Sequence, residues 1–379
     1  MHNINTEIID IASAKITITK PTRLPIPFYD ATMGPFDSIN LSILTISDTD
    51  GNTEDIIVNG SALPYLENIL LPTLLKTPSC TYDKLIKTLF WSIRNEGFRG
   101  NASVGLGQLD MLLHSLVAKR KDLTLRAYFG SDINAVTVYA SGGSAMLSKE
   151  DLVKEMRGWV DEGYTILKMK VGRGGAAGID KDIERIKAVR KAVGDDIAIS
   201  VDFNQSLELN EALEVFKKCE DLNLAWIEEP LLAADLEGIA SLCSQTSIPV
   251  SYGESERSGK VIPSLLSTGI DHLQVISGYL TTMGEWLDSA RAAQRLNRKV
   301  SSGGFSQLAC HWCAVAGNGA FTEYLIPILD AYNPFFSVKP HVENGKFILT
   351  DLPGIGVEIN WDYINKNGFI QTQKLIDKP

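Results

Sequence analysis

The sequence predicts an α/β protein whose centre is a closed barrel of parallel strands. From residue 134 onward, eight short apolar runs alternate with amphipathic segments, which favours a parallel sheet covered by helices. Eight is also the number of strands that closes such a sheet into a barrel. Acidic residues and lysines stand at the ends of several of these runs, where barrel enzymes carry their working residues.

The N-terminal region has a different texture and is expected to form a separate unit. Residues 7–60 are rich in strand-forming residues, and Ser38–Ser47 is predicted to be one strand. Pro21–Pro35 is punctuated by proline and glycine, so we expect a long loop there, of a length typical of binding loops. Residues 62–121 carry periodic Leu, Ile and Trp and are predicted to be helical.

The barrel region can be read strand by strand. The predicted strands are Ala135–Tyr139, Thr165–Lys170, Ile197–Asp202, Ala225–Glu228, Val250–Tyr252, Leu273–Ile276, Val300–Ser302 and Glu323–Ile326. The clearest helix is Ile179–Val193, which has charged residues on a polar face. After residue 335 the strand and turn texture returns, and we expect this tail to pack back on the N-terminal unit.

Length, composition and charge exclude several classes of protein. A chain of 379 residues, 44% hydrophobic and 22% charged, is long enough for a large core and two domains. A net charge of −10 without any basic run argues against nucleic acid as a partner. An anionic substrate remains possible, because a bound divalent cation and nearby lysines can reverse the local field.

Targeting and redox features favour the cytoplasm. The N-terminal residues lack the pattern of a signal peptide, and no apolar run approaches the length of a membrane span. The five cysteines are odd in number and scattered, which fits a reducing compartment. Cys310 and Cys313 form a C-x-x-C pair inside a helical pattern, so packing is favoured over a metal or redox site.

Three acidic residues are spaced equally along the barrel region. Asp202, Glu228 and Glu254 each follow an apolar run, at a constant interval of 26 residues. One strand, one helix and two loops take about 25 to 30 residues, so successive units would bring these carboxylates to one end of the sheet. Three convergent oxygen ligands make a hard-cation site, for which Mg²⁺ is the natural occupant. The alternative is three capping or ion-paired carboxylates.

Two lysines end the preceding apolar run. Lys168 and Lys170 are two positions apart on a predicted strand, so their side chains point the same way. Both ammonium groups could therefore face the metal site, where the cation would hold an anion and a lysine would move a proton. The alternative is a solvated pair on an edge strand.

Five strings in the sequence resemble a known family. They are Lys-Met-Lys-Val-Gly, Val-Asp-Phe-Asn-Gln-Ser, Trp-Ile-Glu-Glu-Pro, Tyr-Gly-Glu-Ser and Pro-Gly-Ile-Gly-Val-Glu. Their order and spacing resemble the enolase superfamily and, within it, the mandelate racemase/muconate lactonizing enzyme family. Arg99–Lys119 also resembles the helix before the barrel, although Leu113 and His114 stand where Trp-Asp is usual. Glu254 as third ligand, rather than Asp, favours the racemase-like group over the cycloisomerase-like group.

The resemblance implies a modified (β/α)₇β barrel with an α+β capping domain formed by the N-terminal region and the tail. The expected segments are a capping domain at 1–130, the barrel at 131–335 and the returning tail at 336–379. It also implies one Mg²⁺ on the three carboxylates, a small carboxylate substrate and a homo-oligomer. The common reaction removes a proton α to a carboxylate, which at neutral pH requires a cation on that carboxylate.

The resemblance further implies roles for single residues. Lys170 is expected to be the base, with a pKa lowered by its surroundings, and Lys168 its electrostatic partner and a contact of the substrate carboxylate. Glu323, the first residue of the last predicted strand, corresponds to an acid that would donate a hydrogen bond to the substrate in its protonated form. Its alternative is a structural ion pair. The side chains expected to line the substrate pocket are Asn204, Tyr139 and Ser141.

Two positions depart from the family pattern. Racemase-like members carry an Asp after the sixth strand and a His after the seventh, and these positions align with Ile276 and Gly303. Racemisation needs a proton donor on each face of the substrate, so a two-base racemase is not expected. A one-base elimination or cycloisomerisation remains. In a dehydration, the departing hydroxide could be protonated by the lysine, by Tyr252 or by Ser306.

The predicted function is therefore a Mg²⁺-dependent lyase that dehydrates a hydroxylated carboxylate, with an acid sugar as the favoured class. One alternative is a cycloisomerase or epimerase with an unrecognised second acid. Another is a carboxylate-binding relative that has lost its activity. The substrate itself cannot be read, because loops and the capping domain set specificity in such a fold.

Overall fold

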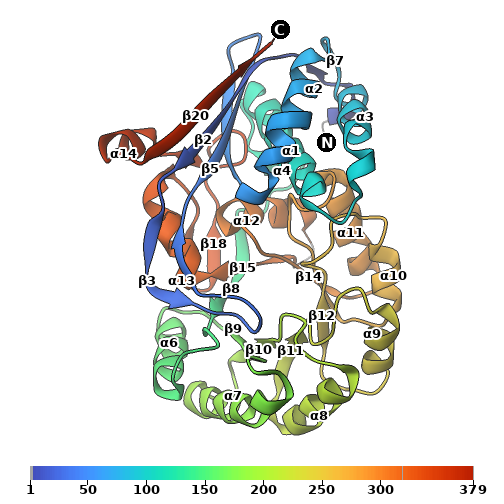
Figure 1. Cartoon of the computed structure of the whole chain (residues 1–379), viewed down its shortest axis with the longest axis vertical. Coiled ribbons are helices and arrows are strands. Elements are labelled where there is room, and N and C mark those ends of the chain that lie inside the picture. The colour runs from blue at the N-terminus through green and yellow to red at the C-terminus, as the bar shows by residue number, and fades with distance from the viewer. Residues whose placement is uncertain (1–2, 318, 379) are drawn as a thin grey trace.

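The computed structural model describes residues 3–317 and 319–378, which form two units (Figure 1). A ring of strands surrounded by helices makes up the lower part of the view, and a smaller unit lies above it. The earliest and the latest strands of the chain both lie in the upper unit. In the described residues, no helix has the length and apolarity needed to cross a membrane.

Eight parallel strands of the described chain close the lower unit into a barrel. They are β8 (Ala135–Gly142), β9 (Ile166–Lys170), β10 (Ala198–Asp202), β11 (Leu224–Glu228), β12 (Val250–Tyr252), β13 (His272–Gln274), β14 (Lys299–Ser302) and β15 (Phe321–Leu325). Each strand pairs with the next, and β15 pairs with β8 to complete the ring. The predicted barrel is confirmed, and its strands differ from the prediction only at their ends.

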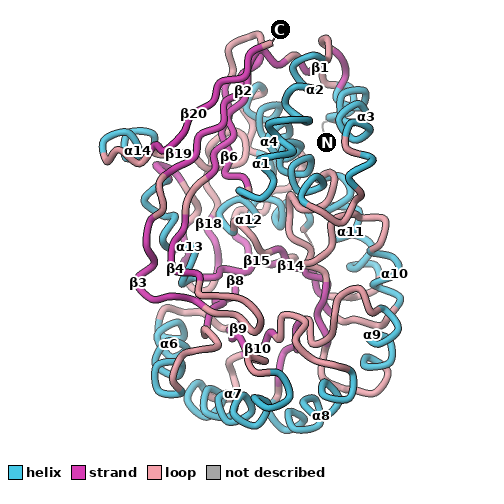
Figure 2. The backbone as a smooth tube through the Cα atoms, viewed as in Figure 1, coloured by secondary structure: helices cyan, strands magenta, loops and turns pink. Residues whose placement is uncertain are grey.

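Helices connect the strands and surround the ring (Figure 2). Between β8 and β15 the described residues form α6 (Lys149–Asp161), α7 (Ile179–Val193), α8 (Leu209–Cys219), α9 (Leu236–Cys243), α10 (Ile262–Ser267), α11 (Met283–Arg295) and α12 (Ser306–Ala316). The short α13 (Ile326–Leu329) follows β15 directly. Seven connecting helices between eight strands make the (β/α)₇β barrel that the resemblance implied.

The helix α7 shows how the sequence sets these elements. Its buried apolar residues recur every three or four positions, at Ile179, Ile183, Ile186 and Val189. Gly194 ends the helix with φ +82°, a backbone conformation that glycine adopts without strain. The observed bounds are the predicted ones, because periodicity and the terminating glycine agree.

An aromatic layer fills the barrel interior. Tyr139, Trp226 and Phe321 form a buried cluster in which Tyr139 and Trp226 have ring centroids 5.4 Å apart. His272 stacks on Phe321 with ring centroids 5.2 Å apart. Side chains at the strand ends therefore rest on a packed core rather than on an open pore.

The capping domain combines an antiparallel sheet with helices. The sheet order is β20 (Ile370–Asp377), β2 (Ile11–Thr19), β5 (Ser42–Asp48) and β6 (Thr53–Val58). The buried helix α4 (Asn101–Arg120) packs against β6. The other helices of this region are α1 (Leu63–Tyr65), α2 (Leu71–Lys76), α3 (Tyr82–Ser92) and α5 (Leu125–Tyr128). Two short strands, β1 (Ile8–Ile9) and β7 (Cys80–Thr81), pair with each other. Of these, β7 interrupts the region predicted to be helical.

Two predictions for the N-terminal region are wrong in detail. The expected loop Pro21–Pro35 contains a strand, β3 (Thr22–Phe28), and the expected strand Ser38–Ser47 is divided between β4 (Phe36–Ile39) and β5. The prolines of β3 are tolerated because β3 pairs with β4 alone and through few residues, so their missing N–H groups interrupt no continuous ladder.

The loop between β3 and β4 docks on the barrel. The backbone N–H of Tyr29 donates to Ser144 Oγ at 2.9 Å. Arg173 donates to the carbonyl oxygens of Asp30 and Met33 at 3.1 and 3.0 Å, and its guanidinium lies 4.9 Å from the centre of the Tyr29 ring. This loop of the capping domain therefore lies over the turns that follow β8 and β9.

The tail divides between the two units. β20 pairs with β2 in the capping sheet, as expected. The hairpin of β17 (His341–Glu343) and β18 (Lys346–Ile348) instead pairs with the start of β8, where β15 leaves the edge of that strand open. The remaining elements are β16 (Phe336–Val338), which pairs with β19 (Glu358–Ile359), and α14 (Trp361–Lys366).

Candidate active site

The register of the barrel strands brings the candidate residues to one level at the carboxyl-terminal mouth. Lys170 stands beside Asp202 in the ladder, and Asp202 stands beside Glu228. Glu254 follows β12 after a turn at Gly253, whose φ is +133°. A Cβ at Gly253 would also lie 3.1 Å from the backbone of β13, so the turn that delivers Glu254 requires glycine.

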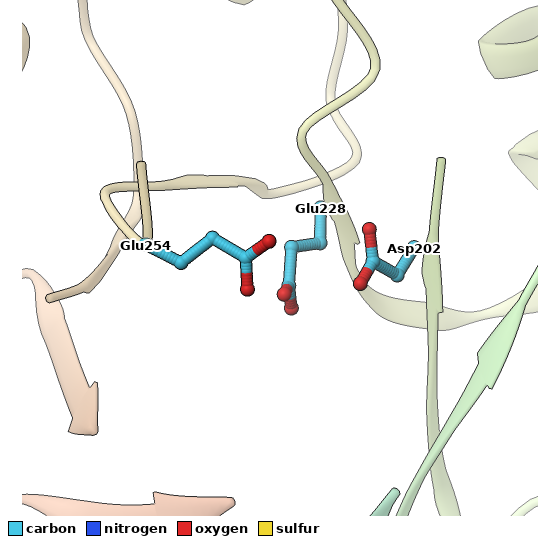
Figure 3. A group of neighbouring side chains, drawn as sticks. All are labelled: Asp202, Glu228 and Glu254. Carbon is cyan, nitrogen blue, oxygen red and sulfur yellow. The ribbon is translucent and has the colours of Figure 1, made fainter. Parts of the chain in front are cut away.

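The three predicted ligands point toward one another (Figure 3). One carboxylate oxygen from each of Asp202, Glu228 and Glu254 lies within 4.8 Å of the others. Burial, and then the neighbouring carboxylates, raise the pKa of Glu254 to about 8. Buried carboxylates that repel one another are the donor set that a hard divalent cation neutralises, so the residues fit Mg²⁺.

Hydrogen-bond donors hold two of these carboxylates in place. The backbone N–H of Asn204 donates to Asp202 Oδ1 at 2.8 Å, and its side-chain amide donates to Oδ2 at 3.2 Å. The indole N–H of Trp226 donates to Glu228 Oε2 at 3.1 Å. Such donors orient metal ligands. Asn204, expected to contact substrate, thus has its amide N–H directed at a ligand.

Lys168 and Lys170 both point into the carboxylate cluster. Lys170 Nζ lies 2.5 Å from Asp202 Oδ2, and Lys168 Nζ lies 2.6 Å from Glu228 Oε1. Burial lowers the pKa of Lys170, but the carboxylates of Asp202, Glu254 and Glu323 together outweigh burial and raise it. Burial likewise lowers the pKa of Lys168, but Glu228 and Glu323 together outweigh burial and raise it. The sequence led us to expect a pKa of Lys170 lowered by Lys168 and a bound Mg²⁺, whereas the carboxylates of the cluster raise it.

Glu323 completes the ring of charges. Its Oε1 lies 2.7 Å from Lys168 Nζ. Burial raises the pKa of Glu323, but Lys168 and Lys170 outweigh burial and lower it. The carboxylate is therefore ionised, which differs from the protonated donor that the resemblance implied. It is also the third residue of β15, not the first residue of its strand.

Gln274 is a site residue that the sequence reasoning missed. Its amide nitrogen donates to Glu228 Oε1 at 2.9 Å and to Glu323 Oε2 at 3.1 Å, and its oxygen accepts from the Tyr139 hydroxyl at 2.9 Å. The signal was an amide inside the predicted strand Leu273–Ile276, because a buried amide needs partners.

Two predicted substrate contacts lie beneath the site instead. Tyr139 has no exposed surface and packs in the aromatic layer, with its hydroxyl bound to Gln274. Ser141 is also fully buried on β8, and its hydroxyl helps to lower the pKa of Glu323. The prediction that they line the pocket is a misreading of strand length, because β8 continues to Gly142 and both residues lie inside it.

A cavity of about 250 Å³ opens above the charged cluster. Lys170, Glu254 and Glu323 are the charged residues that line it. The other lining residues are Asn59, Ile276, Tyr279, Gly304, Phe305, Leu325, Ile328, Leu329 and Tyr332. Asn59 comes from the capping domain, and the rest follow β13, β14 and β15. Sequence reasoning proposed no member of this second group as a substrate contact, because loops carry no periodic pattern.

Residues 151–363, more than half of the chain, match the family described as enolase C-terminal domain-like. The chain belongs to the enolase superfamily. Among its relatives, L-talarate/galactarate dehydratase of Salmonella typhimurium is 28% identical over 280 residues, which cover 73% of this chain and 69% of the relative. Arabinonate dehydratase of Saccharolobus solfataricus is 27% identical over 301 residues, covering 78% and 80%. A 3,6-anhydro-alpha-L-galactonate cycloisomerase of Streptomyces coelicolor is 26% identical over 357 residues, covering 91% and 96%.

Solved structures of superfamily members share the whole fold. The L-talarate/galactarate dehydratase of Salmonella typhimurium with Mg and L-lyxarohydroxamate has a TM-score of 0.84 at 23% identity, over 100% of this chain and 97% of that one. A racemase of Streptomyces coelicolor A3(2) with bound magnesium has a TM-score of 0.84 at 22% identity, over 95% and 99%. These likenesses confirm the barrel with its capping domain.

The structure places the two positions that depart from the family pattern expected from the sequence. Ile276 lines the cavity, and a Cβ at Gly303 would lie 2.6 Å from Glu323 Oε2, so the carboxylate takes up that space. The two suggested proton donors are bound elsewhere. The Tyr252 hydroxyl bonds the backbone of the loop after β11, and the Ser306 hydroxyl donates to the carbonyl oxygen of Glu323.

Proposed function

We propose that this protein is a Mg²⁺-dependent lyase that removes the proton α to a carboxylate and eliminates water from a hydroxy acid. Acid sugars and related hydroxy acids are the proposed substrate class. The observation that carries the proposal is Lys170, which borders the cavity and lies 2.5 Å from a carboxylate of the three-acid cluster. The relatives named as dehydratases support the same type of reaction.

Asp202, Glu228 and Glu254 are the proposed ligands of Mg²⁺. When bound, Mg²⁺ supplies the positive charge that stabilises the negative charge developing on the substrate carboxylate. Asn204 and Trp226 hold Asp202 and Glu228 in their orientations through the hydrogen bonds described above. The site therefore has both its ligands and the donors that position them.

Lys170 is the proposed base. Mg²⁺ on Asp202 and Glu254 would offset the carboxylates that raise the pKa of Lys170, so that the lysine acts in its amine form on the α-proton. Lys168 has no exposed surface, so we propose that it acts through its charge, which lowers the pKa of Glu323, and not by direct contact with the substrate. Glu323 in turn fixes Lys168 at 2.7 Å. A base on one face of the substrate suits an elimination.

The proposed elimination uses this one lysine twice. Lys170 takes the proton from C2, the C–H electrons form the C2–C3 double bond, and the C3–O bond breaks. The hydroxide receives the proton from the Lys170 ammonium and leaves as water, which regenerates the amine. Departure on the lysine face makes this a syn elimination. Tyr279, whose side chain lines the cavity, is the alternative donor.

The test is a panel of hydroxy acids incubated with protein and Mg²⁺ in D₂O and analysed by mass spectrometry. Loss of water from one acid, with solvent deuterium in the product, is the expected result. Lys170→Ala should lower the rate by about 10²- to 10⁴-fold. The matched control is Lys149→Ala, which removes an exposed lysine at the start of α6. Unchanged turnover in Lys170→Ala would reject the proposed base.

A cycloisomerase is the second candidate, because the named cycloisomerase aligns with 91% of this chain. The same experiment separates the two reactions. A cycloisomerase exchanges or moves the α-proton without losing water, so the product keeps the mass of the substrate apart from deuterium. An acid that binds with Mg²⁺ and never exchanges its α-proton would instead favour a carboxylate-binding protein.

We also propose the cellular location, the oligomeric state and the domain organisation of the protein. The described cysteines are free thiols, which fits the cytoplasm. A homo-oligomer is proposed by analogy with the superfamily. The division into a capping segment, a barrel and a tail near residues 130 and 335 is proposed as the domain organisation, with β17 and β18 as the part of the tail that joins the barrel.

A further inference from the structure

The cavity above the candidate active site is lined by side chains of two kinds. Lys170, Glu254 and Glu323 are the charged groups among them. Ile276, Phe305, Leu325, Ile328 and Leu329 are the apolar ones. Phe305 packs edge-on against Tyr332, with ring centroids 5.6 Å apart, so these rings form a continuous wall. We call the apolar side chains and Tyr332 the apolar wall. A substrate held by the charged groups meets this wall within the same cavity.

The cavity also lacks a second positive charge for a distal anion. Among the described residues that line it, Lys170 is the one with a cationic side chain. The nearby Arg257 donates to the carbonyl oxygens of Glu254 and Glu256 at 2.7 and 2.9 Å, and its guanidinium stacks 4.6 Å from the centre of the Tyr279 ring. A second carboxylate at the far end of a substrate would therefore be buried without a partner, which is unfavourable.

The neutral hydrogen-bonding side chains that line the cavity are Asn59, Tyr279 and Tyr332. The Asn59 amide donates to the Tyr279 hydroxyl at 2.5 Å, which uses one amide N–H and leaves the Tyr279 O–H as a donor. An acid sugar carries a hydroxyl on each carbon of its chain, and each hydroxyl that loses water without gaining a partner weakens binding. An apolar substituent instead gains from contact with Ile276, Phe305 and Ile328.

We propose that the substrate is a 2,3-dihydroxy monocarboxylic acid whose substituent at C3 is apolar, branched aliphatic or aromatic, and not a polyhydroxylated or dicarboxylic sugar acid. This inference rests on the proposed reaction and, within the hydroxy acids, replaces acid sugars by acids with an apolar substituent. Loss of the C2 proton and of the C3 hydroxyl as water yields an enol, which becomes a 2-oxo acid with the apolar substituent intact. No oxidant or second substrate is needed.

The first test measures binding without turnover. In the presence of Mg²⁺, titration calorimetry compares 2-hydroxy-4-methylpentanoate with 2-hydroxyglutarate, which share the 2-hydroxy acid head and lack a C3 hydroxyl. We expect the Kd of the apolar acid to be at least tenfold lower. Equal affinities, or tighter binding of 2-hydroxyglutarate, would overturn the inference.

The second test measures turnover in D₂O with 2,3-dihydroxy-4-methylpentanoate, 2,3-dihydroxy-3-phenylpropanoate, arabinonate and galactarate. We expect water loss from an apolar acid, with kcat/KM at least tenfold above that of either sugar acid. Faster turnover of arabinonate or galactarate would overturn the substrate class and leave the proposed function standing. No α-proton exchange with any acid, by protein shown to bind Mg²⁺, would overturn both.

Variants of the residues of the apolar wall test whether these side chains cause the preference for apolar acids. Ile328→Asn should lower kcat/KM for the apolar acids by about tenfold or more and should not lower it for the sugar acids. Leu325→Asn is the second variant, used if the first unfolds. Leu296→Asn, at an exposed position after α11, is the control and should change neither. Equal losses for all acids in a folded wall variant would contradict the inference.

Discussion

Two regions of the barrel treat buried ionisable groups in opposite ways. At the carboxyl-terminal mouth, the buried Lys168 and Lys170 have pKa values raised by neighbouring carboxylates, and both lysines lower the pKa of Asp202. In the aromatic layer and in α12, burial lowers the pKa values of His272 and His311, so they are neutral. Charge is thus concentrated at the mouth, where a cation and a proton must be handled.

This difference explains why a reaction that moves protons on one face of the substrate suits the protein. Apart from Lys170, Glu254 and Glu323, the polar side chains among the described cavity residues are Asn59, Tyr279 and Tyr332, so no further charged acid or base borders the cavity there. Burial raises the pKa of Tyr332 to about 12, so that hydroxyl stays neutral. The proton must therefore be taken and returned from the lysine side, unless Tyr279 takes part.

The largest expected effect comes from a change in the carboxylate cluster at the mouth of the barrel. Glu254→Gln removes one proposed Mg²⁺ ligand, so we expect Mg²⁺ affinity to fall by at least a hundredfold and α-proton exchange to fall further. Because burial and neighbouring carboxylates hold the pKa of Glu254 at about 8, the same change should raise the melting temperature in EDTA. Titration calorimetry and thermal melts measure both.

The control for that variant is Glu184→Gln, at an exposed position of α7. It should alter neither Mg²⁺ affinity nor the melting temperature in EDTA. Full Mg²⁺ affinity in Glu254→Gln would mean that the cluster binds its cation through other groups.

An intermediate effect is expected from a change beside Glu323. In Gly303→Ala the new Cβ would lie 2.6 Å from Glu323 Oε2, and Glu323 is fixed by Lys168 and Gln274. A shift of Glu323 would stretch its ion pair, so we expect a roughly tenfold loss of kcat. Gly158→Ala, on α6 with open space at the Cβ, is the control. Equal kcat in the two variants would show that the position of Glu323 does not matter.

A smaller effect is expected beneath the site. Tyr139→Phe removes the hydroxyl that donates to Gln274, and the free energy of unfolding should fall by about 1 kcal/mol in denaturant titrations. The exchange rate should fall only a few fold, since Tyr139 does not reach the cavity. Tyr65→Phe, at a half-buried position of the capping domain, is the comparison. A loss of activity as large as that of a ligand variant would return Tyr139 to the list of substrate contacts.

The smallest effect concerns a buried neutral histidine of α12. Burial, and then Arg126, lower the pKa of His311 to about 3, whereas an unfolded histidine titrates near 6.5. Between these values the unfolded chain binds a proton that the folded chain does not, so stability falls as pH falls. His311→Gln should reduce the loss between pH 6.5 and 5.5 by about 1 kcal/mol in denaturant unfolding. An identical pH slope in the variant would show that His311 is charged when folded.

Much of the architecture could be predicted because it depends on local patterns. Alternating apolar runs and helical periodicity indicated every barrel strand, and α7 was predicted to the residue. The three acids were predicted because a repeat of strand and helix converts constant spacing along the chain into a shared end in space. These features need only the periods of regular structure and no knowledge of distant contacts.

The misplaced residues share a different cause. Tyr139 was assigned to the pocket because a sequence does not show where along a strand the barrel interior gives way to the mouth. The pKa of Lys170 was expected to fall because of Lys168, two residues away, and a bound Mg²⁺, whereas Asp202 at 2.5 Å, which raises this pKa, comes from another strand. Gln274 was missed because its partners, Glu228 and Glu323, lie far away in the chain.

The sequence by itself determined the barrel and the identity of the charged residues at the strand ends, because period and spacing are local properties, and the resemblance to a family implied the capping domain. Only the tertiary structure decided how the pKa values of those residues shift and which residues are hidden, because Coulomb energy and burial depend on distances between strands. It also decided that an apolar wall from β13, β14 and β15 lines the same cavity as Lys170. That wall is assembled from loops whose positions are set by packing alone.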